Sequence, residues 1–246
     1  MFKQFNIETK TDYFTELSTS VKFEPVIKGR QGTVLVDYSD NTIPIVRTTT
    51  KYDKPAQKFL PIHYNLIKEI KNEVKENIEL KLNNALIEIY DNTYRTMGYH
   101  SDQALDLKDD SYICIFSCYD NPNTKDIRKL RVKNKTTKEM MNYELNHNSI
   151  LLFSLKTNQN HLHKIILDKV TDGVKWLGVT FRLSKTFIEF IDKKPYFTHS
   201  KKLLTIANDD KQKEFYKMRS TENKSIDYKY PDIEYSISIS DLMLIE

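Results

Sequence analysis

The stretch LHKIILDKVTDGVKWLGVTFRLS, residues 162–184, has the pattern of two short β-strands around a turn. Apolar residues recur in LHKIILDK (162–169), and WLGVTFRLS (176–184) is rich in β-branched and aromatic residues. The intervening VTDG (170–173) carries turn residues. Two strands joined in this way can direct side chains from both onto one interior face. The stretch therefore predicts a β core.

Five more short β runs precede this pair of strands. They are NALIEIY (84–90), YICIFSCY (112–119), IRKLRVKNK (127–135), MNYELN (141–146) and SILLFSL (149–155). About seven short strands separated by polar turns are typical of a sandwich, a barrel or a jelly roll. We therefore expect a mainly β protein of the α+β class, with helices flanking the β core.

Helical and hairpin patterns lie on either side of the β runs. PIHYNLIKEIKNEVKENI (61–78) has apolar residues at helical spacing, and the pattern turns helical again in KKLLTIANDDKQKEFYKMRSTEN (201–223). GTVLVDYSDNTIPIVRTTTKY (32–52) has the pattern of two strands around a turn. We expect three parts: an N-terminal extension with a lid-like hairpin (1–60), the β core (61–199), and a C-terminal extension packed on the core (200–246).

Composition limits the class of protein. The chain has 246 residues, of which 39% are hydrophobic and 29% charged, as expected for one large globular domain. The formal net charge of +4 is compatible with a nucleic-acid partner, but also with an ordinary lysine-rich surface. Cys114 and Cys118 read as small core residues in a reducing compartment. No run of 18 apolar residues occurs, so we expect a cytoplasmic or nuclear protein, neither secreted nor membrane-bound.

The segment MGYHSDQALDL (97–107) contains a candidate for two metal ligands. In extended backbone, alternate side chains point the same way, so His100 and Asp102 share one side. A facial Fe(II) site consists of two imidazoles and one carboxylate and leaves three positions open. The pair therefore needs one more histidine from a distant segment.

Four histidines downstream could supply this third ligand. His163 begins a strand, and we favour it because a sheet would fix its side chain. His161 shares that face but falls in a polar turn, and His147 falls in a turn where we expect a solvated side chain. The remaining candidate is His199. From His163 to Arg182 there is room for one strand, a turn and the return strand, so a buried Arg182 could grip a carboxylate inside the same interior.

Several of these segments resemble a known family in their order. NALIEIYDNTYRTMGYHSDQ, CIFSCYD and HKIILDKVTDGVKWLGVTFR look like the AlkB-like branch of the Fe(II)- and 2-oxoglutarate-dependent dioxygenases. The resemblance extends over about residues 60–190. It places Tyr90 about ten residues before the His-x-Asp pair, and Ser117 on the strand that follows. His163 takes the place of the second histidine, and Arg182 that of the second of two arginines.

The resemblance implies a fold and an oxidoreductase activity. The fold is a double-stranded β-helix, which is a form of jelly roll. Fe(II) would be held by His100, Asp102 and His163, with no catalytic residue beyond these ligands. 2-Oxoglutarate would bind the iron, contact Tyr90 and be fixed at its far carboxylate by Arg182, and O2 would take the last position. The reaction would oxidise a C–H bond, and an N-methyl substrate would be demethylated.

The chain departs from the family at two positions. The first of the two arginines falls on Trp176, so one usual carboxylate anchor is absent. An asparagine two positions before the tyrosine is replaced by Glu88, and an acid beside a bound diacid is unfavourable unless it is turned away or protonated. The cradle for 2-oxoglutarate is therefore expected to differ from that of the family.

The substrate is less well defined. If 128–135 is a strand, Lys129, Arg131, Lys133 and Lys135 share a face that would suit a phosphate backbone, although a solvated outer face is the alternative. Arg47 in the lid-like hairpin could also contact a substrate. A methylated nucleic-acid base, which the reaction would demethylate, is thus one candidate. The alternatives are hydroxylation of a protein or small molecule, and a non-catalytic β-sandwich that binds a partner.

Overall fold

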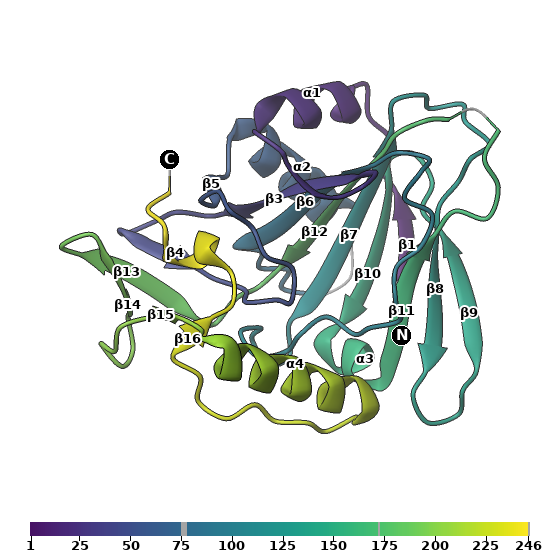
Figure 1. The fold of residues 1–246 in the computed structure, drawn as a ribbon. Helices are drawn as coiled ribbons and strands as arrows, with labels where there is room; N and C mark the ends of the chain where they lie inside the picture. The colour runs from purple at the N-terminus through teal and green to yellow at the C-terminus, as the bar shows by residue number, and fades with distance from the viewer. Residues whose placement is uncertain (75–77, 172, 246) are drawn as a thin grey trace.

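The largest sheet has eight strands and forms the centre of the molecule (Figure 1). The computed structural model describes residues 1–74, 78–171 and 173–245. Seven strands follow the order β1-β10-β7-β12-β6-β3-β2 with antiparallel neighbours, and β5 pairs with β3 in parallel. Their bounds are β1 Lys3–Asn6, β2 Glu24–Ile27, β3 Arg30–Val36, β5 Gln57–Lys58, β6 Asn84–Tyr90, β7 Tyr112–Tyr119, β10 Ser149–Ser154 and β12 Trp176–Arg182.

A smaller sheet contributes to a second core against one face of the large sheet. It consists of β11 (His161–Ile166), β8 (Lys129–Asn134) and β9 (Met140–Glu144), in that order. Leu130 and Val132 are fully buried, while their neighbours on β8 are half-buried, as the alternation in the sequence requires. Apolar side chains from both sheets form this core, among them Tyr90, Ile115, Leu130, Phe153, Ile165 and Trp176.

Two helices cover the opposite face of the large sheet (Figure 1). These are α1 (Tyr13–Ser20) and α2 (Pro61–Glu73). Asp12 caps α1 by accepting a hydrogen bond from the backbone N–H of Thr15 at 3.1 Å. Both helices bury one apolar side on the sheet, through residues such as Tyr13, Leu17, Leu66 and Ile70. The helix expected over 61–78 therefore ends at Glu73, and residues 75–77 lie outside the described part of the chain.

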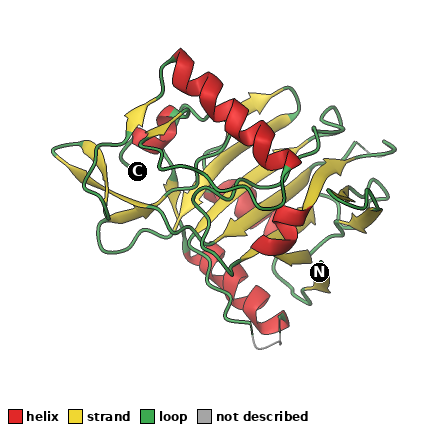
Figure 2. Ribbon diagram, turned by 90° about the horizontal axis from the view of Figure 1, so that it is seen from below, coloured by secondary structure: helices red, strands yellow, loops and turns green. Residues whose placement is uncertain are grey.

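The remaining elements lie at the edges of this assembly (Figures 1 and 2). A three-stranded sheet combines β4 (Thr42–Pro44), β13 (Phe187–Ile191) and β14 (Lys194–Phe197). The short helix α3 (Leu155–Asn160) joins β10 to β11, and α4 (Asp209–Lys224) lies on the side away from α1 and α2. The last elements are β15 (Thr205–Ile206), β16 (Tyr235–Ser236) and a 3-10 helix at Ile239–Leu242.

The observed fold is mainly β, as the sequence predicts, and the described residues form four α-helices. Two expectations need correction. The strands at 30–36 and 42–44 do not pair with each other as a lid-like hairpin, because β3 joins the large sheet and β4 pairs with β13. Residues 1–60 thus supply strands to the sheet. In the C-terminal part, the helix begins at Asp209, and residues 201–208 include a short strand instead.

Two smaller expectations also have an outcome. Cys114 and Cys118 are free and buried in the core, as expected. Of the helices in the described part of the chain, none is both long enough and apolar enough to cross a membrane. The turn expected at 170–173 includes Asp172, which lies outside the described residues.

Candidate metal centre

The structure brings His100, Asp102 and His163 into one cluster. One potential ligand atom from each of the three side chains lies within 4.8 Å of the other two. His100 and His163 are joined by their backbones, because the N–H of each donates to the carbonyl of the other, at 3.0 and 2.6 Å. This isolated antiparallel bridge fixes the segment around His100 against β11 and sets the two rings 4.7 Å apart. His163 itself is held by its pairing with Val132 on β8.

The imidazole of His100 is prepared for coordination through Nε2. Its Nδ1 lies 3.0 Å from the carbonyl oxygen of Gly98. A carbonyl only accepts hydrogen bonds, so Nδ1 carries the proton and Nε2 keeps a free lone pair. Burial and the neighbouring His163 lower the pKa of His100 to about 3, which keeps the ring neutral. A hydrogen bond from the second ring nitrogen to a carbonyl is a common feature of metal-bound histidines.

Asp102 is ionised and held in place by Arg182. Burial alone would raise the pKa of Asp102, but the guanidinium of Arg182 outweighs this effect and holds the pKa well below its usual range. Nε and Nη2 of Arg182 both lie 2.7 Å from Oδ2 of Asp102. The other oxygen, Oδ1, lies 3.4 Å from Nε2 of His163. Arg182 thus contacts the candidate metal ligand, and its role as an anchor for the far carboxylate stays a prediction.

The donor set fits a divalent transition metal. Two imidazoles and one carboxylate are the ligands of facial Fe(II) sites. The distance of 3.4 Å between His163 and Asp102 is longer than an ordinary charge-assisted hydrogen bond of about 2.7–2.9 Å. A cation between the three side chains would bind Nε2 of His163 and Oδ1 of Asp102, which do not form a close hydrogen bond. Nδ1, the other ring nitrogen of His163, is buried and has no hydrogen-bond partner among the described residues.

The loop that carries Asp102 is fixed from both sides. From α3, the side chain of Asn158 forms two hydrogen bonds of 2.8 Å with the backbone N–H and carbonyl of Asp102. On the other side, Arg219 of α4 donates to the carbonyl of Ser101. Two more α4 residues accept hydrogen bonds from loop backbone N–H groups: Asn223 from that of Ser101 and Glu222 from that of Ala104.

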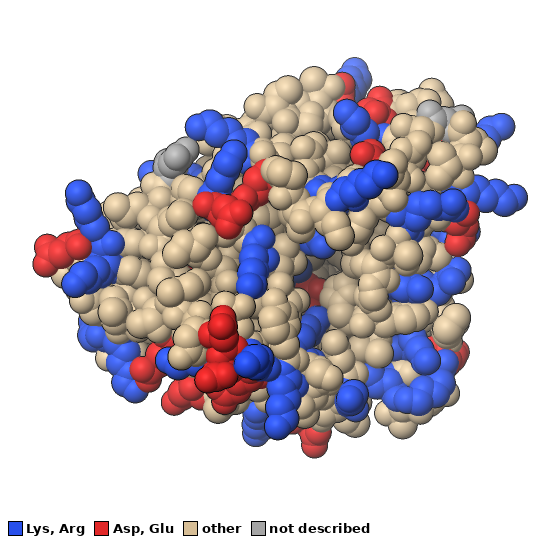
Figure 3. Space-filling model, in the orientation of Figure 1, with Lys and Arg blue, Asp and Glu red and all other residues tan. Residues whose placement is uncertain are grey.

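A cavity of about 440 Å³ opens next to the cluster, and a recess with side chains of both charges is visible near the middle of Figure 3. Arg182 is the last residue of β12 and contacts Asp102, so the cluster lies at that end of the strand. Of the apolar lining, Leu86 and Ile115 lie level with Thr180, two residues before Arg182, and Val46, Leu130 and Ile165 also contribute. The volume is within the usual range for a small-molecule site, which is roughly 300–1,000 Å³.

Arg30, Glu88 and Tyr90 line another part of the cavity. Oε2 of Glu88 accepts a hydrogen bond of 2.7 Å from the hydroxyl of Tyr90. Its Oε1 forms an ion pair with Arg30, with Nε at 2.6 Å and Nη2 at 2.5 Å. Tyr90 is thus inside the cavity but is engaged with Glu88. Burial would lower the pKa of Arg30, but Glu88 outweighs this effect and raises it, so Arg30 is charged.

The other histidines considered as ligands lie outside the cluster. Nδ1 of His161 lies 2.8 Å from the carbonyl of Thr157, and His161 is in β11 rather than in a turn. His199 packs against Phe197. His147 is half-buried, and its Nδ1 accepts a hydrogen bond from the backbone of Tyr119, which corrects the expectation of a solvated side chain.

The expected substrate residues take different places. Arg47 is only 3% exposed, and its guanidinium binds Asp106 and the carbonyls of Ile233 and Tyr235. It is therefore a structural residue and does not belong to an exposed lid. Lys135 is also buried, and its ammonium group donates to the carbonyls of Glu222 and Ser225 at the end of α4.

The other three side chains of the expected cationic face do lie on the outer face of β8. Lys129, Arg131 and Lys133 alternate with buried residues on this strand. Lys129 and Arg131 both pair with Asp168, at 3.3 and 3.7 Å, so one acid partly neutralises them. Figure 3 shows many basic side chains on the side of the molecule where Figure 1 places β8 and β9.

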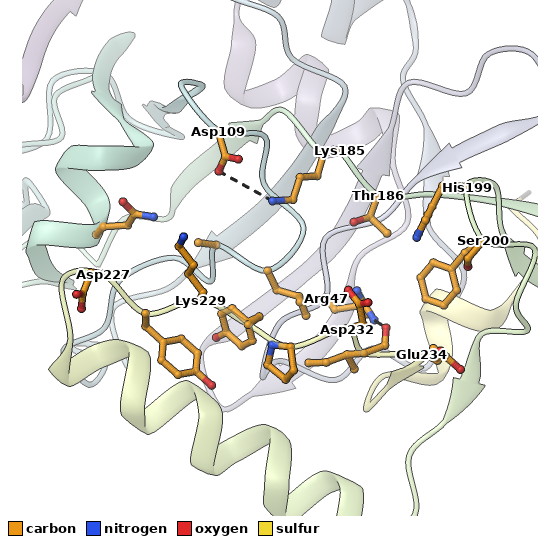
Figure 4. A pocket seen from close by; sticks show the side chains of 18 of the residues that line it. Arg47, Asp109, Lys185, Thr186, His199, Ser200, Asp227, Lys229, Asp232 and Glu234 are labelled. Atoms are coloured by element: carbon orange, nitrogen blue, oxygen red, sulfur yellow. Dashed lines mark hydrogen bonds and ion pairs between the residues drawn. The ribbon is translucent and has the colours of Figure 1, made fainter.

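A second hollow lies near the C-terminal segment and has no comparable cluster (Figure 4). Its volume is about 770 Å³, and its lining mixes both charges. The labelled side chains in Figure 4 include Lys185 and Asp109, which form a weak ion pair of 4.0 Å. No group of three or more metal-ligating side chains is found there among the described residues.

Sequence reasoning missed three side chains that shape the candidate site. Asn158 and Arg219 fix the metal-ligand loop, and Arg30 enters the cavity from β3. Asn158 is 56 positions from Asp102, and Arg30 is 58 positions from Glu88. The register of β3 on β6 brings Arg30 to Glu88, and the packing of α3 and α4 brings Asn158 and Arg219 to the loop. Neither composition nor periodicity reports such long-range contacts.

Comparisons with known proteins add little to this geometry. No family model and no curated protein matches the chain. Solved structures do match, and one of them is OsALKBH1, with a TM-score of 0.40 and 14% sequence identity. The match covers 63% of this chain and 78% of OsALKBH1. A TM-score this low does not establish a shared fold, so the function has to be inferred from the side chains.

Proposed function

We propose that this chain is an Fe(II)- and 2-oxoglutarate-dependent dioxygenase whose two facing sheets form a double-stranded β-helix. The observation that carries the proposal is the cluster of His100, Asp102 and His163 at one end of a cavity. A two-histidine, one-carboxylate set with free positions is the ligand pattern of non-haem Fe(II) oxygenases. The cavity provides space beside the cluster for a cosubstrate and for part of a substrate.

The protein's own groups have defined tasks in this proposal. His100, Asp102 and His163 would hold the metal, Arg182 keeps Asp102 ionised, and the apolar side chains in the lining of the cavity would limit access of water. When bound, iron and 2-oxoglutarate would supply the oxidising chemistry: O2 is reduced, 2-oxoglutarate becomes succinate and CO2, and one oxygen atom enters a substrate C–H bond. On an N-methyl group, the hydroxymethyl product breaks down to formaldehyde.

A nucleic acid is the substrate class that we propose. Support comes from Arg131 and Lys133 on the outer face of β8. Lys164 on the neighbouring strand β11 pairs with Arg131 and adds a third cation. The ammonium group of Lys164 lies 4.7 Å from the ring centre of Tyr99, and Tyr99 lines the cavity. Cations that lead to an aromatic side chain at a cavity suit a phosphate backbone with one base directed inward.

Anaerobic calorimetry tests the dioxygenase proposal. We expect the parent to bind one Fe(II) per chain and then 2-oxoglutarate. Replacement of a supporting residue around a metal typically costs about 10–100-fold in affinity, so His100→Ala should lose at least about 100-fold. His199→Ala, away from the cluster, serves as the matched control and should bind like the parent. If the parent bound no Fe(II), or bound Fe(II) without 2-oxoglutarate, the proposal would be wrong.

A further inference from the structure

Three residues on neighbouring strands face the same side of the large sheet in register. Arg30 of β3 pairs with Tyr90 of β6, and Tyr90 pairs with Trp176 of β12. Their rings and guanidinium group are close: Tyr90 and Trp176 have ring centres 4.8 Å apart, and the guanidinium carbon of Arg30 lies 5.9 Å from the centre of the Tyr90 ring. A cation is therefore present at the level of Trp176, two strands away from it.

The indole of Trp176 takes up the space on its own strand. A Cβ atom on Gly178 would lie 2.0 Å from the indole of Trp176, so the ring lies over this glycine. The indole nitrogen is buried and has no hydrogen-bond partner among the described residues. Trp176 has no positive charge with which to bind an anion. Its indole also fills the space over Gly178 that an anion beside β12 would need. At the level of Trp176 in the sheet, a cation for an anionic ligand has to come from another strand.

Arg30 is the cation in the cavity that can change partners. Arg182 is engaged with the candidate ligand Asp102, and Arg219 is engaged with Glu222 and the carbonyl of Ser101. Among the described residues, these three arginines are the cationic side chains that line this cavity. Arg30 keeps 15% of its side chain exposed, and both of its ion-pair contacts go to one oxygen of Glu88. A guanidinium has five N–H donors, so several remain for a ligand.

The polarity of the cavity matches a linear molecule with two anionic ends. Along β12, Arg182 contacts the metal cluster, and Thr180, two residues before it, lies between the apolar residues Leu86 and Ile115. Further from the cluster, Gly178 lies level with Glu88, and Trp176 with Tyr90 and Arg30. An oxo acid that chelates a metal through its head group and carries a carboxylate beyond a short aliphatic spacer has the same sequence of polarities. 2-Oxoglutarate is such a molecule.

We propose that Arg30 binds the distal carboxylate of the oxo acid and that Glu88 is the counter-ion which the ligand displaces. This inference rests on the proposed function and assigns the anchor to β3 instead of β12. Glu88 can release Arg30 and still accept the hydrogen bond from Tyr90. Because one carboxylate replaces another, the resting ion pair opposes binding. Removing the charge of Glu88 should therefore strengthen binding of a dicarboxylate. If the ion pair were only structural, removing this charge would not strengthen binding.

Calorimetry on the Mn(II)-loaded protein tests this inference without turnover. Two probes are compared: 2-oxoglutarate, and 2-oxopentanoate, which has the same head group but a methyl group in place of the distal carboxylate. The variants are Glu88→Gln, which keeps Arg30, and the double variant Arg30→Gln/Glu88→Gln, which leaves no unpaired buried charge. Lys28→Gln removes an exposed cation two positions away and is the matched control for general electrostatic effects.

We expect the parent to prefer 2-oxoglutarate over 2-oxopentanoate by at least about tenfold, the size expected for one charged hydrogen-bonded contact. Glu88→Gln should strengthen binding of 2-oxoglutarate and leave that of 2-oxopentanoate unchanged. The double variant should bind both probes alike, while Lys28→Gln should behave as the parent does. Mn(II) affinity should be the same in all four proteins.

The contrary outcomes are separable. If the double variant keeps the preference for 2-oxoglutarate, the anchor is not Arg30, although the dioxygenase proposal stands. If the parent prefers 2-oxopentanoate, Glu88 repels the distal carboxylate and the inference is wrong. If Mn(II) binds and neither oxo acid does, the inference and the cosubstrate both fail, but the metal centre remains. Failure to bind Mn(II) or Fe(II) would instead contradict the proposed function itself.

Discussion

Asn158 holds Asp102 by both of its backbone polar groups, through two hydrogen bonds of 2.8 Å from one fully buried side-chain amide. The amide thus sets the position of the carboxylate in the metal cluster, although Asn158 is not itself one of the candidate ligands. Backbone hydrogen bonds set the positions of the two histidines: those of β11 with β8 for His163, and the bridge to His163 for His100. The candidate metal site is therefore built on fixed backbone.

Asn158→Ala is expected to weaken metal binding without removing a ligand. Loss of the amide frees the Asp102 backbone, so the affinity for Fe(II) or Mn(II) should fall by about 10–100-fold. Calorimetry measures this effect, and Asn160→Ala, at the end of the same short helix, is the control. Equal metal affinity in Asn158→Ala and the parent would show that the loop does not depend on this residue.

Arg182→Met should make metal binding sensitive to acid. In the parent, Arg182 holds the pKa of Asp102 well below its usual range against the effect of burial. Without Arg182, burial raises that pKa, so protons compete with the metal at a higher pH than in the parent. Titration of Mn(II) affinity between about pH 5 and 8 should show a steeper fall towards the acidic end. If metal binding were unchanged and only 2-oxoglutarate binding abolished, Arg182 would instead be the carboxylate anchor that the sequence suggested.

Gly178→Ala is expected to destabilise the fold. The new Cβ would overlap the indole of Trp176, which would have to move within a packed core. Such overpacking typically costs about 1–3 kcal/mol in the free energy of unfolding, measurable by urea denaturation. Gly98→Ala should change little, because a Cβ there meets no atom within 4 Å. A cost in Gly178→Ala that persisted after Trp176→Leu would point to a cause other than this contact.

His63 should make the folded state lose stability in mild acid. Its ring is fully buried on α2, accepts a hydrogen bond from the backbone of Leu60, and has a pKa that burial lowers from 6.5 to about 4. Below pH 6.5, the unfolded chain binds a proton that the folded chain binds only near pH 4. Stability therefore falls as the pH decreases through this window, by up to roughly 3 kcal/mol.

Unfolding of the parent and of His63→Gln at about pH 7 and about pH 4.5 measures this contribution. The difference in unfolding free energy between the two pH values should be smaller in the variant. An equal difference in both proteins would assign the acid sensitivity to other groups.

Lys133→Gln/Lys164→Gln tests the nucleic-acid proposal. For each cation removed from a phosphate, the log–log slope of affinity against salt for a single-stranded oligonucleotide should become shallower by about 0.7. Fluorescence anisotropy at several salt concentrations gives the slope, and Lys68→Gln/Lys71→Gln on α2, across the large sheet, is the control. If the slope became shallower by the same amount in both double variants, binding would reflect net charge alone, and a protein or small-molecule substrate would be favoured.

Local patterns predicted much of the fold. The strand at 84–90 and the strand at 112–119 have the expected bounds, because apolar and β-branched runs bounded by turn residues have few alternatives. The pairing of strands could not be predicted in the same way. From its own sequence, GTVLV is expected to pair with the strand that follows it, but β3 pairs with β2 before it and with β6, some fifty residues later. The register between distant strands depends on packing of the whole core.

In the candidate site, too, some features follow from the local sequence and others depend on residues far away in the chain. The alternation that places His100 and Asp102 on one side is a local property, and the apolar alternation after His163 singles it out, although β11 itself begins at His161. Arg47 shows the limit: its sequence neighbours suggest an exposed turn, and only the buried carboxylate of Asp106, 59 positions away, explains why it is inside. The sequence likewise predicts Lys135 on a cationic face, but β8 ends at Asn134 and the ammonium group of Lys135 is buried against the end of α4.

The contacts of α4 have a consequence for any shortened form of this protein. Arg219, Glu222 and Asn223 hold the backbone of the loop around Asp102 from a helix more than a hundred positions further along the chain. A version that stops before Asp209 would retain all three candidate ligands and every strand of both main sheets. It would nevertheless lack one of the two supports of the ligand loop, so the C-terminal helix belongs to the smallest unit in which the metal centre can be studied.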